Sequence, residues 1–273
     1  MSFDYKPLTL DCRPLVMEWL KKFPPTISEM TFSNLYMWRE KRPLRMLFLD
    51  QTLLFFLEGE PLTLFGPPIG PLTLEEATKK LPIQRVERVV SPPKISGWNF
   101  VDLPSQADYL YKVEDLINLP GHTFHRQRQL IHGALSRYEC LYEAITTKNL
   151  SECRHFLEKH PVPAEKAASD LLLDHFEEWE LQGCVVRIED QIEAVMVGEP
   201  LNPNTFVAHL ARVEKTKHGL YALLDHWFAE RVAKGYDYLN LEQDLGIEGL
   251  KVAKERLQPD QQILKYSGSR IDI

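Results

Sequence analysis

Two polar residues that could carry acid–base chemistry lie at the C-terminal end of a strand-like segment, 236–241, in the last fifth of the chain. Side chains alternate along a strand, so Asn240 and Glu242 should point to one side. In an open α/β sheet, the carboxyl ends of strands border the crevice where ligands bind. A carboxylate there could accept a proton from an attacking amine, which makes Glu242 and Asn240 the candidate catalytic pair. The alternative for Glu242 is a structural carboxylate that holds the turn at 246–249.

A basic group precedes a predicted helix at 219–234. The N-terminus of a helix offers unpaired N–H groups and a partial positive charge, and lysines add full charges. A pyrophosphate or the end of a tRNA could bind there, and the alternative is an ordinary solvated turn. The candidate donor- or phosphate-binding residues are Lys215, Lys217, His218 and Gly219.

The most basic stretch, 122–132, is predicted to be helical, with an apolar side for packing. Arg126 and Arg128 could present forked donors to phosphate oxygens and so extend the donor site. Two alternatives remain open for this stretch. It could be a solvated face neutralised by neighbouring acids, or it could bind RNA in its own right.

Further residues are candidates for lining a cleft. Tyr109 lies on a predicted strand near the expected domain junction. Asp244 follows the catalytic pair and could instead cap the next helix. Lys265 and Tyr266 precede Ser267–Ser269, which we expect to be flexible. The alternative is that Tyr109, Lys265 and Tyr266 are ordinary packing residues with no role in a site.

The elements that must position these residues occur in the same order in both halves: helices, a meander of short strands, a helix and a strand. In the first half these segments are 11–23, 28–38, 45–50, 53–58, 62–65, 74–81 and 88–90. In the second half they are 140–145, 149–159, 163–183, 184–188, 193–197, 205–213, 219–234, 236–241, 248–257 and 262–266. The fold class is therefore α+β or α/β, with predicted domains at 1–137 and 138–273.

Composition narrows the classes of function. The 273 residues include 32 basic and 39 acidic ones, a net charge of −7, which argues against non-specific binding of nucleic acid. The four cysteines are far apart, and no H-E-x-x-H pattern occurs, so no metal site is expected. Walker, nucleophile-elbow and Rossmann glycine patterns are missing too, which argues against NTPase, hydrolase and NAD-enzyme functions.

The apolar segments are short. None approaches the roughly 20 residues that span a bilayer, and the N-terminal residues lack the apolar core of a signal peptide. These features predict a soluble, cytoplasmic protein without a membrane span. The oligomeric state is left open by the sequence.

Two segments carry a resemblance to a known family: 108–138, DYLYKVEDLINLPGHTFHRQRQLIHGALSRY, and 238–254, YLNLEQDLGIEGLKVAK. Together with TFSNL at 31–35, they resemble an uncharacterised bacterial family related to the C-terminal domain of phosphatidylglycerol lysyltransferase. The resemblance implies two tandem GNAT-like acyltransferase domains, each with a mixed central sheet flanked by helices, as in the Fem aminoacyltransferases.

The chain departs from the GNAT pattern at one loop. GNAT enzymes usually carry the glycine-rich motif R/Q-x-x-G-x-G/A between the fourth strand and the next helix. The matching segment here, 213–221, has a single glycine, Gly219. The resemblance implies an acyl- or aminoacyl-transferase that moves an activated acyl group to an amine. Acyl-CoA or aminoacyl-tRNA would be the donor substrate in the C-terminal half, with no tightly bound cofactor. The alternative is a non-catalytic GNAT-like module that binds a ligand or a protein.

Overall fold

The computed structural model describes residues 3–92 and 94–271. The chain divides into two compact units. The first unit comprises Met1–Asp108, Gln243–Ile247 and Gln262–Ile273, and the second comprises Tyr109–Glu242 and Glu248–Gln261. Within the described residues each unit is built on a seven-stranded mixed sheet with helices beside it, which gives a mixed α+β fold.

The sheet of the first unit has the order β1-β2-β3-β4-β5-β14-β6. Its only parallel pair among the described strands is β4 with β5, and the others are antiparallel. β3 is central and buried on both faces, as its unbroken apolar run LLFF requires. The strands are β1 Lys6–Pro7, β2 Leu44–Leu49, β3 Thr52–Leu57, β4 Thr63–Ile69, β5 Arg85–Val89, β6 Trp98–Asp102 and β14 Tyr266–Arg270.

Short helices accompany this sheet, and their caps are local. Thr31 caps α2 by accepting a hydrogen bond from the Asn34 backbone N–H, and Thr73 and Glu76 form a capping box on α3. Asp11 lies within a 3₁₀ turn, and α1 begins after Cys12. The helices are η1 Leu10–Cys12, α1 Arg13–Lys22, η2 Ser28–Met30, α2 Phe32–Met37, α3 Leu74–Lys80 and η3 Pro104–Gln106.

The sheet of the second unit has the order β13-β7-β12-β11-β10-β9-β8. Here β11 and β12 form a parallel pair. As in the first unit, the parallel pair follows a meander and is connected through a helix. The strands are β7 Asp108–Lys112, β8 Cys140–Ala144, β9 Gln182–Ile188, β10 Gln191–Asn202, β11 Thr205–Val213, β12 Tyr238–Asn240 and β13 Gln261–Ile263.

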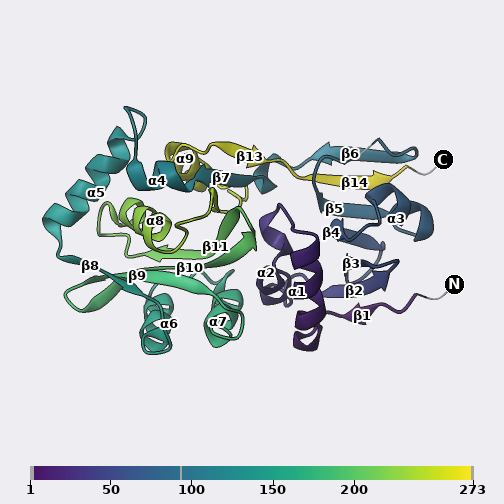
Figure 1. The fold of residues 1–273 in the computed structure, drawn as a ribbon, viewed down its shortest axis with the longest axis horizontal. Coiled ribbons are helices and arrows are strands. Elements are labelled where there is room, and N and C mark those ends of the chain that lie inside the picture. The colour runs from purple at the N-terminus through teal and green to yellow at the C-terminus, as the bar shows by residue number, and fades with distance from the viewer. Residues whose placement is uncertain (1–2, 93, 272–273) are drawn as a thin grey trace. The chain divides into compact units, whose positions relative to one another are not determined.

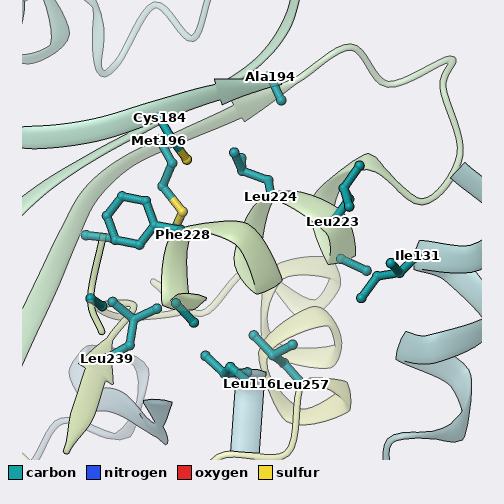
Figure 2. Packing of buried hydrophobic residues seen from close by; sticks show 14 of the residues in the cluster. Leu116, Ile131, Cys184, Ala194, Met196, Leu223, Leu224, Phe228, Leu239 and Leu257 are labelled. Carbon is teal, nitrogen blue, oxygen red and sulfur yellow. The ribbon is translucent and has the colours of Figure 1, made fainter. Parts of the chain in front are cut away.

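The core of the second unit forms around α8. Leu223, Leu224 and Phe228 of α8 are fully buried, together with Cys184 and Met196 of the sheet. Figure 2 shows these side chains gathered around the helix. The helices of this unit are α4 Val113–Asn118, α5 His125–Arg137, α6 Leu150–Lys159, α7 Lys166–Asp174, α8 Leu220–Arg231 and α9 Glu248–Arg256.

Each sheet includes a strand from a distant part of the sequence. β7, from the first half of the sequence, lies in the sheet of the second unit, and the C-terminal β14 lies between β5 and β6. Figure 1 shows β14, in yellow, beside the blue β5 and β6. The expected single strand at 262–266 is therefore wrong, because two strands, β13 and β14, occupy this region. Ser267–Ser269 belong to β14, and a Cβ on Gly268 would come within 2.6 Å of the Phe100 ring.

Two other expected boundaries differ from the structure. The helix predicted to run to 183 ends at Asp174, and turns fill the space before β9. The gap between the predicted strands 193–197 and 205–213 predicts a turn at 198–204, but the turn is shorter, since β10 continues to Asn202. None of the described helices has the length and hydropathy needed to cross a bilayer. The division into domains at 137/138 stays a prediction.

Candidate active site

β11 contains an extra residue opposite β10. Val197 pairs with Leu210 and Gly198 with Ala208, which leaves His209 as a β-bulge. Bulges redirect a side chain and increase the local twist. The strands approach closely here, because a Cβ on Gly198 would lie 2.1 Å from the Val207 carbonyl oxygen. A glycine is therefore required opposite the bulge.

The bulged His209 lies between two carboxylates. Its Nε2 is 3.0 Å from Glu199 Oε1 in β10, and its Nδ1 is 2.7 Å from Glu242 Oε1 after β12. The imidazole is fully buried, and burial disfavours its charged form. The two carboxylates outweigh burial and raise the pKa of His209 to about 10. At neutral pH the imidazolium therefore donates to both glutamates.

β11 and β12 part at this point. Their parallel pairing covers Thr205–Val207 and ends at Asn240, whereas β11 continues to Val213. Asn240 is fully buried, and its Oδ1 accepts a hydrogen bond of 2.8 Å from the Glu242 N–H. Glu242 has a φ of +61°, in the left-handed region. For a residue other than glycine this conformation costs about 1–3 kcal/mol and tends to occur at functional sites.

Tyr109 and Lys254 hold the backbone of this turn. The Tyr109 N–H donates to the Glu242 carbonyl at 3.1 Å, and the Lys254 ammonium donates to the Leu241 carbonyl. The same ammonium lies 5.7 Å from the centroid of the Tyr109 ring. Tyr109 is almost wholly buried and packs in the core of the second unit. Its backbone N–H thus holds the Glu242 carbonyl, while its side chain belongs to the core.

An open basic pocket of about 430 Å³ lies beside the start of α8. Gly219 has a φ of +90°, and a Cβ there would lie 2.3 Å from the Leu130 carbonyl oxygen, so α5 packs directly on this turn. Arg126, Leu130, Gly133 and Arg137 form one stripe along α5. The pocket is lined by Arg126, Gln129, Leu130, Gly133, Arg137 and His218.

The remaining basic candidates lie outside this lining. Lys217 forms an ion pair of 3.7 Å with Glu193 and lies over the Tyr138 ring. Lys215 is exposed on the same loop. Arg128 donates to the Leu119 carbonyl just beyond α4. The pocket also includes no residue of the turn that carries Asn240 and Glu242.

Lys265 lies in the first unit and is fully buried. Its ammonium is 2.5 Å from Glu29 Oε2 and 2.6 Å from Asp108 Oδ1. Asp108 also accepts hydrogen bonds from the Ser28 N–H and hydroxyl and from the Gln243 amide. This internal network joins four distant segments of the chain.

The two other candidates for lining a cleft, Asp244 and Tyr266, form part of a turn and of a strand in the first unit. Asp244 Oδ1 accepts a hydrogen bond of 2.7 Å from the Gly246 N–H, which closes a tight turn. Tyr266 begins β14, pairs with Val89 and Asp102, and is partly buried against the core of this unit.

Sequence reasoning did not single out His209, Glu199 or Arg137. The available signal was a polar residue inside an otherwise apolar strand, which His209 is, but Glu199 was placed in an expected turn. In the part of the chain that the structure describes, no group of three or more His, Cys, Asp or Glu side chains is arranged to hold a metal ion.

Known structures share this fold. A conserved protein of unknown function from Bacteroides thetaiotaomicron is 27% identical with a TM-score of 0.89, over 98% of this chain and 100% of that one. L-PGS from Bacillus licheniformis is 14% identical with a TM-score of 0.67, over 98% and 94%. A tandem GNAT protein from the clavulanic acid biosynthesis pathway is 10% identical with a TM-score of 0.50, over 100% and 99%. These likenesses support a GNAT-like fold.

A search of curated proteins finds no match to the chain. Comparison with protein families does find a match: residues 20–267 match the family described as phosphatidylglycerol lysyltransferase, C-terminal. The match includes both segments that suggested the resemblance, 108–138 and 238–254, and it spans both units. The chain therefore belongs to the phosphatidylglycerol lysyltransferase C-terminal family.

Proposed function

We propose that the chain is a transferase that moves an activated acyl or aminoacyl group to an amine, with the donor held in the second unit. The observation that carries the proposal is the buried Glu199–His209–Glu242 cluster at the point where β11 and β12 part. The chain is similar in fold to L-PGS and to a tandem GNAT protein, and this similarity supports a transferase of this general class.

The phosphate-bearing part of the donor would bind at the pocket beside α8. Arg126 and Arg137 make no ion pair within the described residues, and Gly133 between them leaves room for a ligand. Guanidinium groups bind phosphate oxygens in pairs. The start of α8 adds N–H groups and a partial positive charge, with His218 and Gly219 beside them. Lys215 and Lys217 would contribute to the field around the loop.

The reactive end of the donor would lie near Glu242. β11 continues for six residues beyond Val207, which is roughly 20 Å of strand. A donor extended along β11 would thus place its phosphates at the loop and its ester or thioester where the strands part. Acyl-CoA and aminoacyl-tRNA both have an activated carbonyl separated from phosphates.

Glu242 would act as the general base. Its carboxylate is partly exposed, and the hydrogen bond from His209 to one of its oxygens orients the carboxylate toward an incoming amine. The amine nitrogen attacks the carbonyl carbon, its proton passes to Glu242, and the alkoxide or thiolate of the donor leaves. Asn240 fixes the backbone of Glu242 and so positions this carboxylate. General-base catalysis of this kind contributes about 10²–10⁴ in rate.

Donor binding and transfer test the proposal together. The full chain is incubated with labelled acetyl-CoA, longer acyl-CoAs or aminoacyl-tRNA, with an amine as acceptor, and thermal stability is followed in parallel. We expect one donor class to bind saturably, to raise the free energy of unfolding by RT ln(1 + [L]/Kd) and with it the melting temperature, and to transfer its acyl group. The double variant R126Q/R137Q should weaken donor binding at least about tenfold.

The matched control for this variant is Arg45→Gln, since Arg45 is an exposed arginine whose partner is Glu58. It should bind the donor as the wild type does. Saturable binding without transfer would instead establish a non-catalytic ligand-binding module. If no donor binds, the proposal is rejected.

A further inference from the structure

A second pair of arginines lies in the first unit, at the edge of its sheet where β4 and β5 begin and β14 ends. Arg85 of β5 and Arg270 of β14 line one open pocket of about 640 Å³. None of its lining residues is acidic. The lining consists of Pro61, Pro82, Gln84, Arg85, Ser269 and Arg270.

The backbone around this pocket is fixed by the sheet. Arg85 and Ser269 are direct partners in the antiparallel pairing of β5 and β14. The Arg270 N–H donates to the Gln84 carbonyl at 2.9 Å, and the Gln84 N–H donates to the Leu62 carbonyl at 3.0 Å. The positions from which the two arginines project are therefore preorganised. Binding would have to order only their side chains.

Within the described residues these arginines lie outside ion pairs, although Arg85 interacts electrostatically with Glu87 on the same strand. Neither forms an ion pair, although the chain contains 39 acidic and 32 basic residues. Other arginines of the same unit do have partners: Arg45 lies 2.8 Å from Glu58, and Arg88 lies 3.3 Å from Glu29. Two unpaired guanidinium groups on one pocket of an acidic protein favour an anion.

We propose that this pocket binds the phosphate group of a small organic ligand. Arg85 and Arg270 would provide forked, charge-assisted donors to the phosphate oxygens. The Ser269 hydroxyl and the Gln84 side-chain amide line the same space and add neutral donors. The pocket is much larger than one phosphate group, so the ligand carries an organic part that lies against Pro61 and Pro82. Its source is either a soluble phosphomonoester or the headgroup of a phospholipid.

Calorimetric titration and thermal shift of the full chain test the site. The soluble probes are inorganic phosphate and glycerol 3-phosphate, with glycerol as the uncharged comparison. The lipid probes are vesicles of phosphatidic acid, with phosphatidylcholine vesicles for comparison. We expect saturable binding of glycerol 3-phosphate or of phosphatidic acid vesicles, and none of glycerol or phosphatidylcholine. Binding in the soluble arm would identify a metabolite, and binding in the vesicle arm alone would identify a lipid headgroup.

Variants assign the binding to this pocket. Arg85→Gln and Arg270→Gln should each weaken binding about tenfold, and the double variant should abolish saturation. Arg45→Gln is the matched control, because it removes an exposed but paired arginine from the same sheet. Both pocket arginines are exposed, so the two single variants and the double variant should have melting temperatures without ligand within about a degree of the wild type.

The double variant R126Q/R137Q separates this site from the donor pocket of the second unit. It should bind the phosphate probes as the wild type does, whether or not the chain proves to be a transferase. The proposal is overturned if no phosphate probe binds saturably, or if R85Q/R270Q binds like the wild type.

Discussion

His209 is the residue on which the candidate site depends most. A fully buried imidazole would ordinarily be neutral, because burial penalises charge. Here Glu199 and Glu242 reverse that preference and raise its pKa to about 10. The cluster therefore holds Glu242 in one orientation, with one carboxylate oxygen fixed.

Removing His209 should destabilise the second unit. His209→Asn would leave the buried carboxylate of Glu199 and the partly exposed one of Glu242 without their positive partner, and breaking such a cluster costs about 3–5 kcal/mol. Urea unfolding at pH 7 measures the loss. His155→Asn is the control, because His155 is exposed on α6, and it should change stability by less than about 0.5 kcal/mol. A loss below about 1 kcal/mol for His209→Asn would contradict the buried ionic cluster.

The same residue predicts a pH dependence. Folding raises the pKa of His209 from 6.5 to about 10. The stabilisation is therefore complete below pH 6.5 and is lost as the pH rises toward 10. The difference in unfolding free energy between wild type and His209→Asn should shrink from pH 6.5 to pH 10. A difference that is constant across this range would show that His209 is neutral in the folded protein.

At this scale the sequence predicted part of the site. Glu242 and Asn240 could be singled out as candidates because they lie at the end of a strand, and strand ends border binding crevices. His209 and Glu199 could not, since their meeting depends on a bulge between β10 and β11 that alternation alone does not reveal. The roles of these residues in catalysis stay predictions.

At the scale of elements, the β10–β11 pair is the part of the second unit that shapes the site. Gly198 was expected in a turn, because glycine commonly marks turns. It lies instead within β10, opposite the bulge, where the neighbouring backbone excludes a side chain. Strand existence was predictable from apolar runs, whereas the length of β10 was not, because Gly198 and Pro200 interrupt its pattern.

Gly198→Ala tests this explanation. The added methyl would overlap the Val207 carbonyl and force the strands apart, so we expect a loss of about 1–3 kcal/mol in unfolding free energy. Gly249→Ala in α9 is the matched control, because a Cβ there meets nothing within 4 Å. Alanine favours helix, so the control should be neutral or stabilising by up to about 1 kcal/mol. Equal effects of the two substitutions would argue against a required close approach at Gly198.

At the scale of the whole molecule, the chain passes through the first unit three times. Residues 29 and 108 of the first pass, 243 of the second and 265 of the third meet in one network around Lys265, and β14 completes the sheet between β5 and β6. The sequence predicted the repeated order of elements, since each was visible from local pattern. It did not predict that β7 joins the sheet of the second unit and β14 that of the first, because strand pairing across more than 100 residues leaves no local signal.

Lys265 should be essential to this arrangement. Lys265→Met would leave Asp108 and Glu29 buried without their ammonium partner, so we expect a loss of about 3–5 kcal/mol in urea unfolding. The control, Lys22→Met, removes an exposed pair with Glu18 and should cost less than about 1 kcal/mol. Similar stabilities of the two variants would mean that the network contributes little to the fold.

The rate of acyl or aminoacyl transfer by Glu242→Gln, relative to the wild type, tests the central claim most directly. The substitution keeps the size of the side chain and an oxygen that can accept from His209, but it removes the base. With the donor saturating and the folded fraction matched, we expect transfer to an amine to be about 10²–10⁴ slower, with donor binding unchanged. Transfer by Glu242→Gln at the wild-type rate would contradict the assignment of this carboxylate, and with it the proposed active site.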